Sequence, residues 1–469
     1  MGTRPPAGPR VHFVGIGGIG MSGIARVLLA RGARVSGSDV RMTPTMAQLA
    51  ALGARVAVGH AAAHVRGADL VVYSSSITPQ NPELAAARDA GIPLRGRGQM
   101  LAACLAGKTG IAVSGAHGKT TTTSLIAAAL LAAGQDPTII VGGDVAQFGG
   151  NARVGRGPHV VVEADESDGS FLYLAPAVAV ITNIEEEHLD YYRNLHEILQ
   201  AYQQFVARLP ARGALICCGD DPGVRQLLST LRGRRRVTTY GLGPDCQVTA
   251  ESPQAAGRQV SYVARYRGRR LGRMTLQIPG LHNVVNSLAA VGVGLTLGLE
   301  FAAVRRALAD YTGAGRRFQP RGEIGGVMVI EDYAHHPTEI AATLQAARTW
   351  PGRRLFCVFQ PHRFSRTKYL QDRFGTAFAA ADHLILTDVY AASEDPLDGV
   401  GAESLARAVR ASGFTAIQVL RRDAIVPRLV ATVRSGDLVL VLGAGDIGQV
   451  AVELVQALKT RATATVKAA

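Results

Sequence analysis

Long apolar runs, metal-binding cysteine patterns and aromatic residues are all scarce in this chain of 469 residues. No apolar stretch reaches the roughly 18 residues of a membrane-spanning helix, and Val11–Val14 runs straight into glycines instead of extending into a signal peptide. The five cysteines form an odd count without metal-ligand spacing, which indicates buried thiols in a reducing compartment. We therefore expect a soluble, cytoplasmic protein with no membrane partner.

Acidic residues are also few, since 36 of them face 50 basic residues and leave a net charge of +14. The basic residues are scattered, however, and the densest run, Arg232–Arg236, contains no aromatic residue that could stack on a base. We therefore expect no nucleic-acid partner. A positive surface would also suit phosphate-rich small ligands.

Strands alternate with helices along most of the chain, which predicts an α/β protein with parallel sheets. The length allows several domains, and we expect a disordered lead-in over 1–10 followed by domains over 11–106, 107–318 and 319–469. Short β runs between residues 236 and 278 predict a small, partly antiparallel sheet added to the central domain. The Thr/Ala-rich tail after Leu458 is expected to fray.

Lysine is the scarcest charged residue, with five copies against 45 arginines, and one copy lies in the segment Ser114–Thr123, SGAHGKTTTT. An apolar run precedes this segment and a helix closed by glycine follows it, so its backbone N–H groups and the helix dipole form an anion cradle. Lys119 adds a full charge, and the Thr120 hydroxyl can ligate Mg²⁺. The spacing G-x-x-G-K-T is two residues shorter than the usual phosphate-loop pattern. It predicts an ATP site.

Two further glycine turns match the dinucleotide-binding pattern G-x-G-x-x-G. The first, Gly15–Gly20, follows a strand and has Asp39 about twenty residues further on. The second, Gly443–Gly448, also follows a strand, and both cannot be nicotinamide sites in one ordinary dehydrogenase. We therefore expect a phosphate-bearing ligand in the first domain and a tight strand-to-helix turn at the second match.

Acidic residues and a histidine follow the strands of the central domain. Glu163 comes directly after Val160–Val162, and the carboxyl ends of parallel strands open onto one crevice, so Glu163 is predicted as a Mg²⁺ ligand. Asp165 and Glu166 suit either a site or a solvated loop. His188 suits either a second metal or an exposed surface.

Two motifs in the last domain also follow strands. One contains the paired histidines His335 and His336, which suit either a site or a polar turn. The other contains Arg363 and Arg366, whose spacing suits bidentate capture of a carboxylate or phosphate, or else an exposed basic helix start.

Taken together, these segments resemble the Mur ligases, the ATP-dependent amide-forming enzymes of peptidoglycan precursor assembly. The resemblance covers nearly the whole chain and is to the alanine-adding branch of the family. It is carried by the segments His12–Ala25, Ser36–Asp39, the phosphate loop, Glu163–Asp168, Leu281–Asn286, Gly315–Gln319, Asp332–Glu339 and Gln360–Arg366.

The resemblance implies a fold of three domains: a Rossmann-like N-terminal domain that binds a UDP-sugar, a central P-loop-type ATPase domain, and a Rossmann-like C-terminal domain that closes on the amino acid. The implied UDP-sugar residues are Gly15, Gly17, Gly18, Ile19, Gly20, Asp39, Ser74 and Ser75. The implied ATP residues are Gly115, Ala116, His117, Gly118, Lys119, Thr120, Thr121, Asn283, Asn286, Arg317 and Asp332. Metal would be held by Thr120, Glu163 and His188. The amino-acid side would be lined by Tyr333, His335, His362, Arg363 and Arg366, and the catalytic set would be Lys119, Glu163, His188, His335, Arg363 and Arg366.

The implied reaction joins the lactoyl carboxylate of UDP-N-acetylmuramate to L-alanine through an acyl phosphate, at the expense of ATP. Its cofactors would be ATP and two Mg²⁺ ions, with Mn²⁺ as a substitute, in a monomer or homodimer. His188 and His335 are both candidates for accepting the amine proton, and the sequence does not choose between them.

Two positions depart from the family's pattern, and the absence of a lysine agrees with the alanine-adding branch. Ala116 replaces the threonine usual in the loop, and Glu187 replaces an aspartate beside His188, which could shift the second metal. No lysine lies between Thr120 and Thr367, whereas several sister ligases use a carbamylated lysine there.

Three alternatives stay open. A murein-peptide recycling ligase acting on the same UDP-sugar would share most of the motifs. More distant are an NAD(P)-binding oxidoreductase, suggested by the Gly15–Gly20 turn, and a non-catalytic nucleotide-binding protein, suggested by the basic surface.

Overall fold

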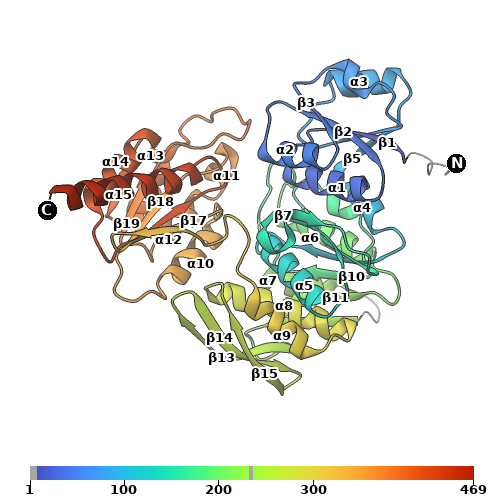
Figure 1. The fold of residues 1–469 in the computed structure, drawn as a ribbon. Helices are drawn as coiled ribbons and strands as arrows, with labels where there is room; N and C mark the ends of the chain where they lie inside the picture. Colours follow the sequence, from blue (N-terminus) through green and yellow to red (C-terminus); the bar gives the residue numbers. More distant parts are fainter. Residues whose placement is uncertain (1–7, 232–235, 469) are drawn as a thin grey trace.

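Each of the three predicted strand–helix alternations folds around its own sheet in the computed structural model, which describes residues 8–231 and 236–468 (Figure 1). Residues 1–7 of the predicted lead-in and residues 232–235 of the basic run lie outside this range. Arg10 already belongs to the first strand. Among the helices in the described ranges, none has the length and hydropathy that a membrane span requires.

The N-terminal domain is a five-stranded parallel sheet in the order β3-β2-β1-β4-β5. Caps explain where its helices start: the Thr43 hydroxyl accepts from the Met46 N–H at 3.2 Å, and Asn81 accepts from the Glu83 N–H at 2.9 Å. Its elements are β1 (Arg10–Val14), α1 (Ile19–Ala30), β2 (Arg34–Asp39), α2 (Pro44–Ala51), β3 (Arg55–Val58), η1 (Ala62–Val65), β4 (Leu70–Tyr73), α3 (Pro82–Asp89), β5 (Leu94–Gly96) and α4 (Arg97–Leu105).

The central domain is built on one ten-stranded sheet in the order β15-β14-β13-β12-β11-β10-β6-β9-β7-β8. Its elements are β6 (Thr109–Ser114), α5 (Lys119–Ala132), β7 (Thr138–Val145), η2 (Ala146–Phe148), β8 (Gly150–Arg153), β9 (His159–Glu163), η3 (Ser170–Tyr173), β10 (Val178–Ile181), α6 (Leu195–Ala207), β11 (Ala214–Cys218), α7 (Pro222–Thr230), β12 (Arg236–Gly241), β13 (Val248–Ala256), β14 (Gln259–Tyr266), β15 (Arg269–Leu276), α8 (Leu281–Leu297) and α9 (Phe301–Asp310). Strand β12 pairs with β13 in parallel, at Tyr240 and Val248, and β13, β14 and β15 pair with one another antiparallel. The added strands therefore extend one edge of the main sheet and do not form a separate sheet.

The register of the central sheet brings the predicted polar residues together. Val113 of β6 pairs with Glu163 of β9, and Ser114 pairs with Ile181 of β10. Because these strands are parallel, the phosphate loop, Glu163 and the segment after β10 all leave the same edge of the sheet.

The C-terminal domain has a six-stranded sheet in the order β16-β17-β21-β18-β19-β20, in which only β16 runs antiparallel to its neighbour. Its elements are β16 (Gln319–Ile324), β17 (Val327–Asp332), α10 (Pro337–Ala347), β18 (Leu355–Phe359), α11 (Phe364–Tyr369), α12 (Gln371–Ala377), β19 (His383–Leu386), α13 (Ala402–Ala411), β20 (Ile417–Val419), α14 (Arg422–Thr432), β21 (Leu438–Leu442) and α15 (Gly448–Ala468).

The predicted fraying after Leu458 is wrong for the backbone, because α15 continues to Ala468. Leu458 is buried in a cluster of apolar residues, and the Arg461 guanidinium donates to the carbonyl of Val433 at the end of α14. These contacts fix the helix against α14, which the Thr/Ala composition of this stretch does not predict.

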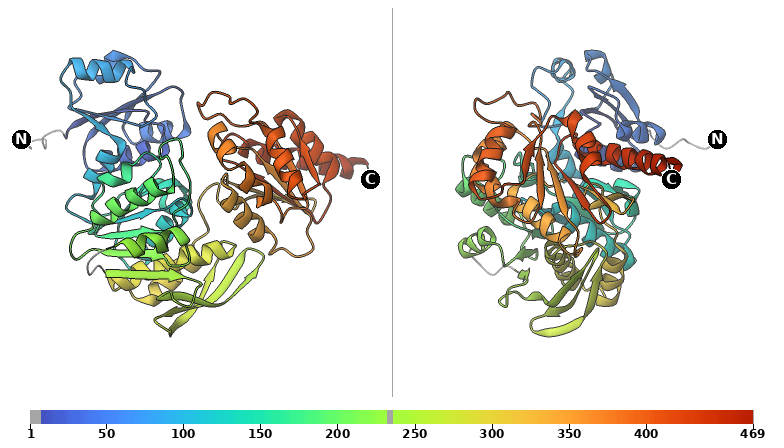
Figure 2. Two further views of the ribbon diagram at one scale, coloured as in Figure 1. Left: turned by 180° about the vertical axis from the view of Figure 1, so that it is seen from behind. Right: turned by 90° about the vertical axis from the view of Figure 1, so that its left-hand side faces the viewer.

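The three domains form an open C, with the C-terminal domain standing opposite the N-terminal domain (Figures 1 and 2). The N-terminal and central domains stack on each other, and one short linker joins the central domain to the C-terminal domain. Arg316 and Phe318 in this linker adopt left-handed backbone conformations, with φ of 57° and 45°. Such values are costly for residues other than glycine, so surrounding contacts must hold the bend.

Candidate functional site

The phosphate loop forms a tight turn between β6 and α5, and the side chains around it leave no room for a larger residue at Gly118. Gly118 is the N-cap of α5 and has a φ of 76°. A Cβ atom there would lie 2.6 Å from Oδ1 of Asn286 on α8. Glycine is therefore required both by the left-handed conformation and by the close approach of α8.

Lys119 folds back into its own loop. Its Nζ donates to the carbonyls of Gly115 at 2.7 Å and Ala116 at 3.2 Å, and to Oε1 of Glu166 at 2.8 Å. Burial alone would lower the pKa of Lys119, but Glu166 and Asp165 raise it above its usual value. The loop thus carries a fixed positive charge, and Glu166, for which the sequence left two interpretations, contacts it directly.

Glu163 lies where the sequence analysis expected a metal ligand. The Thr120 hydroxyl donates to its Oε1 at 3.2 Å, and the Gly142 N–H donates to its Oε2 at 2.7 Å. Burial raises the pKa of Glu163, and Lys119 offsets only part of that shift. A half-buried carboxylate beside a hydroxyl, short of full charge compensation, fits a hard cation such as Mg²⁺.

His188 approaches the same group of acids from the loop after β10. Its Nε2 lies 3.5 Å from Oε1 of Glu166, the carboxylate that also holds Lys119. Its backbone is left-handed, with a φ of 56°, and the Tyr192 hydroxyl donates to the Glu166 carbonyl at 2.7 Å. Glu166 therefore links Lys119 and His188, a connection that strand-end spacing alone did not indicate.

A cavity of about 360 Å³ opens beside the loop, between the central and C-terminal domains. It is lined by predicted ATP residues, namely His117, Gly118, Thr121, Asn283, Asn286, Arg317 and Asp332. Asn286 accepts from the Thr122 hydroxyl at 3.2 Å and donates to Oδ1 of Asn283 at 3.1 Å. The two asparagines therefore fasten the start of α8 to the phosphate loop as well as facing the cavity.

Asp332 lies at the end of β17 and holds the interdomain linker. Its carboxylate accepts from the Phe318 N–H at 2.6 Å and from the Ala334 N–H at 2.7 Å, and burial raises its pKa to about 6. Arg317, in the same linker, lies over the Tyr333 ring with its guanidinium carbon 5.0 Å from the centroid. The linker residues Arg317 and Phe318 therefore pack against residues predicted to bind ligands, Tyr333 and Asp332.

The first glycine turn opens into a second cavity, of about 270 Å³. It is lined by Gly18, Ile19, Gly20, Ser74 and Ser75 together with Arg97, Glu163 and Asp165. The turn of the N-terminal domain therefore shares a cavity with the acids of the central domain.

Two polar contacts near this cavity were not evident in the sequence. The Gly17 N–H donates to Oδ2 of Asp39 at 2.9 Å, so Asp39 closes its own glycine turn. Arg97, at the start of α4, donates to Asp168 at 3.1 Å and to Asp165 at 3.3 Å. Arg97 thereby joins the N-terminal domain to the acidic segment after β9.

The predicted arginines of the C-terminal domain contact the central domain. Arg366 donates to Oε1 of Glu187 at 2.9 Å and 2.6 Å, and Arg363 donates to Asp190 at 2.5 Å. Burial alone would raise the pKa of Glu187, but Arg366 lowers it well below its usual range. The longer acid at position 187 is therefore engaged by an arginine of the other domain.

The remaining predicted residues of the amino-acid side surround these arginines. Nδ1 of His335 lies 3.0 Å from the Tyr333 carbonyl, and His362 stacks on Tyr390 with ring centroids 5.5 Å apart. Burial lowers the pKa of His335 to about 4 and that of His362 to about 3. Both rings are therefore neutral near pH 7.

The second glycine match is the tight turn that the sequence analysis predicted. The Arg316 guanidinium donates to the carbonyls of Gly443 at 2.8 Å and Gly445 at 3.0 Å, and to Glu331 at 2.9 Å. A Cβ atom at Gly445 would lie 2.5 Å from Oε1 of Gln360. The turn is filled by the protein's own side chains.

Comparison with protein families finds three models that match in order. They are described as the Mur ligase family catalytic domain over residues 10–109, the Mur ligase middle domain over 113–294, and the Mur ligase glutamate ligase domain over 316–445. Together they span most of the chain.

Relatives and solved structures of similar length agree with these matches. The chain is 47% identical to UDP-N-acetylmuramate–L-alanine ligase of Pelotomaculum thermopropionicum, over 96% of this chain and 97% of the relative, and 48% identical to the ligase of the same name from Solibacter usitatus, over 96% and 95%. Its fold matches the crystal structure of UDP-N-acetylmuramate-alanine ligase MurC of Thermotoga maritima with a TM-score of 0.81 at 30% identity, over 96% of this chain and 99% of that one. A murein peptide ligase of Psychrobacter arcticus matches with a TM-score of 0.71 at 25% identity, over the same shares.

Proposed function

The chain belongs to the Mur ligase family, and from that premise we propose that it joins UDP-N-acetylmuramate to L-alanine in an ATP-dependent step of peptidoglycan precursor synthesis. One observation carries the proposal. The acids that face the phosphate loop, Glu163 and Asp165, also line the cavity of the first glycine turn, while Gly118 and Thr121 of the loop region line the cavity on the other side. A phosphoryl group bound at the loop would thus lie between a nucleotide and a second ligand.

In this proposal ATP lies in the 360 Å³ cavity with its phosphates on the loop and Lys119. The UDP-sugar lies along Gly15–Gly20 with Ser74 and Ser75, and L-alanine is bound by the C-terminal domain at Tyr333, His335, His362, Arg363 and Arg366. We retain 11–106, 107–318 and 319–469 as the proposed domain boundaries.

Thr120, Glu163 and His188 are the residues that would hold Mg²⁺, with two ions and with Mn²⁺ as a substitute. Bound metal neutralises phosphate charge, so that two anions are able to approach each other. The 3.2 Å contact between the Thr120 hydroxyl and the Glu163 carboxylate supports this assignment, because it brings two oxygen ligands together beside the phosphate loop.

The reaction has two steps. A lactoyl carboxylate oxygen attacks the γ-phosphorus of ATP, forming one P–O bond while the bond to the leaving ADP oxygen breaks. The charge that develops on the phosphoryl oxygens is met by the Lys119 ammonium and the loop N–H groups. The product is an acyl phosphate, whose carbonyl is a far better electrophile than a carboxylate.

In the second step the free amine of L-alanine attacks that carbonyl, and the C–O bond to phosphate breaks from the tetrahedral intermediate. The nitrogen must lose a proton to complete the amide. His335, which burial keeps neutral near pH 7, and His188 are the two candidates for accepting it.

ADP release tests the proposal directly. The full-length protein with UDP-N-acetylmuramate, ATP and Mg²⁺ should turn over with L-alanine, more slowly with glycine or L-serine, and not with a tripeptide. Turnover with the tripeptide alone would move the assignment to the murein-peptide recycling branch, and no turnover with any amino acid would end the ligase proposal. We further propose a cytoplasmic location and a monomer or homodimer.

A further inference from the structure

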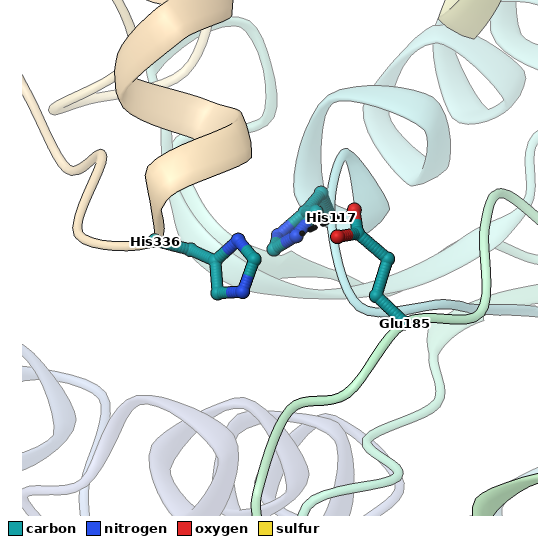
Figure 3. A group of neighbouring side chains, drawn as sticks. All are labelled: His117, Glu185 and His336. Atoms are coloured by element: carbon teal, nitrogen blue, oxygen red, sulfur yellow. Dashed lines mark ion pairs between the residues drawn. The ribbon is translucent and has the colours of Figure 1, made fainter. Parts of the chain in front are cut away.

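A group of three possible metal ligands lies outside the acids around Lys119, at the contact between the central and C-terminal domains. His117 belongs to the phosphate loop, Glu185 to the segment after β10, and His336 is the N-cap of α10 (Figure 3). Each offers one ligand atom, and these atoms lie within 4.8 Å of one another. His336 is one of the paired histidines that suit either a site or a polar turn, and the family resemblance assigns a role only to its neighbour His335.

Each histidine in this group has a carboxylate against a ring nitrogen. Nδ1 of His117 lies 3.3 Å from Oε1 of Glu339, while its Nε2 faces Glu185 at 3.2 Å. Nε2 of His336 lies 3.6 Å from Oε2 of Glu187. A carboxylate on the far nitrogen is how proteins commonly orient histidines that bind a metal.

The group is also short of hydrogen bonds. Within the described ranges, Nε2 of His336 and Oε2 of Glu187 are buried and have no hydrogen-bond partner, whereas Nε2 of His117 makes the 3.2 Å ion-pair contact with Glu185. His336 is wholly buried, and Nδ1 of its ring accepts only a long bond of 3.3 Å from the Thr338 N–H. Buried polar atoms without partners call for a cation or a water between them.

We propose that His117, Glu185 and His336 form an interdomain site for a divalent transition metal of the zinc class, separate from the Mg²⁺ site at Glu163. Two imidazoles and one carboxylate suit Zn²⁺, Co²⁺ or Ni²⁺, whereas Mg²⁺ prefers oxygen ligands alone. Water would complete the coordination. The site goes beyond the proposed ligase activity.

A metal bound here would fix the distance between the phosphate loop and α10. The same contact is already held by ion pairs, since Glu185 accepts from Arg373 at 2.6 Å and from the Thr338 hydroxyl at 3.0 Å. His117 and Glu185 also line the cavity proposed for the nucleotide. We therefore expect a zinc-class metal at this site to inhibit, since it would occupy residues of that cavity and hold the two domains together.

The test of binding uses Co²⁺ as a spectroscopic probe on the chelator-treated, full-length protein without Mg²⁺ or nucleotide. We expect one tight Co²⁺ ion with the visible absorption of a low-coordinate site. His336→Gln and Glu185→Gln should each weaken binding at least about tenfold, because the loss of a partner that only orients a ligand already costs about that much. Two variants are needed because His336 caps a helix, and circular dichroism would check that each variant is folded.

Two control variants separate this site from other places where Co²⁺ could bind. His196→Gln alters an exposed histidine on α6, and Glu163→Gln alters the predicted Mg²⁺ ligand, so both should bind Co²⁺ like the unchanged protein. Unaltered binding by folded His336→Gln and Glu185→Gln would overturn the proposal. So would loss of binding in Glu163→Gln, which would place the metal at the phosphate loop.

The inhibitory role has its own readout. With Mg²⁺ in excess, Zn²⁺ should slow ADP release by the unchanged protein, and Glu185→Gln should need at least about tenfold more Zn²⁺ for the same effect. Equal inhibition of both proteins would overturn the inhibitory role. A failure of the ligase assignment would not affect the Co²⁺ result.

Discussion

The phosphate loop and the C-terminal glycine turn are built alike. Each follows a buried parallel strand and leads into a helix, and in each a cation donates hydrogen bonds to carbonyls of the turn. Lys119 does so at Gly115 and Ala116, and Arg316 does so at Gly443 and Gly445. Each cation is also paired with a buried carboxylate, Glu166 for the lysine and Glu331 for the arginine.

The two turns differ in what lies on their concave side. The phosphate loop borders the 360 Å³ cavity, and its cation comes from the first residue of the following helix. The C-terminal turn is packed against Gln360 and Tyr390, and its cation comes from the interdomain linker. A glycine pattern therefore indicates a binding site only where the protein's own side chains leave the turn empty.

The largest expected effect is on catalytic activity, which should depend on Lys119 and not on Arg316. Lys119→Ala should lower kcat for ADP release about 10³-fold, because it removes the charge that meets the phosphoryl group. Arg316→Ala should retain most of the activity per folded molecule. Steady-state kinetics on both variants would check this, and a Lys119→Ala protein of full activity would refute the assignment of the loop.

The second effect concerns stability, and here Arg316 rather than Lys119 should be the residue whose loss is felt. Arg316→Ala removes charge-assisted bonds to the turn and to Glu331, and should lower the free energy of unfolding by about 2 kcal/mol. Glu331 keeps its pairing with Arg321, which limits the loss. Chemical denaturation would measure the change, with Arg421→Ala, which removes an exposed ion pair with Asp423, as the control.

The third effect is a pH dependence of stability, which we expect for the phosphate loop and not for the C-terminal turn. Burial alone would lower the pKa of His117, but Glu339 and Glu185 raise it to about 10, above the unfolded value of about 6.5. The stability it contributes is thus full below about pH 6.5 and is lost as pH rises through about 10. Arg316 keeps its charge throughout.

In chelator-containing buffer, the stability advantage of the unchanged protein over His117→Gln should therefore shrink by about 1 kcal/mol between pH 6 and pH 10.5. Thermal unfolding at both pH values would measure it. An advantage that stays constant across this window would mean that His117 is not charged in the folded protein.

The smallest effect tests whether the loop needs a hydroxyl at Ala116. Its contacts with an anion come from backbone N–H groups and Lys119, so Ala116→Thr should change kcat/KM by less than about threefold. A larger gain would show that the residue common in the family contributes to phosphate binding here as well. Ala116→Val, of similar size but without the hydroxyl, is the matched control.

Much of this arrangement was predictable because the alternation of strands and helices is visible in the local sequence, and this alternation makes the strands parallel. The carboxyl ends of neighbouring parallel strands lie at one edge of the sheet, so the phosphate loop after Ser114 and the residue Glu163 were expected to lie close together. Contacts made by loops and between domains were not predictable in this way. The pairing of Lys119 with Glu166 and the direction taken by His336 rather than His335 depend on loop paths and helix capping, which strand spacing does not encode.

The C-terminal end of the chain and the role of Asp39 were also not predictable from the sequence. The composition of the tail after Leu458 indicated fraying, whereas burial of Leu458 in an apolar cluster with residues of α14 keeps the helix intact. Asp39 matched a ligand-binding pattern by spacing, but its hydrogen bond to Gly17 also gives it a part in shaping the turn. Tertiary contacts decide such cases, and composition does not report them.

The bend at Arg316 and Phe318 has a consequence for how readily the protein changes shape. Each left-handed residue stores roughly 1–2 kcal/mol, which returns to the chain when the linker relaxes. That return would offset part of the interaction energy that the protein gives up if its domains part. A ligand that prefers one arrangement of the domains by a few kcal/mol then shifts the balance between the arrangements.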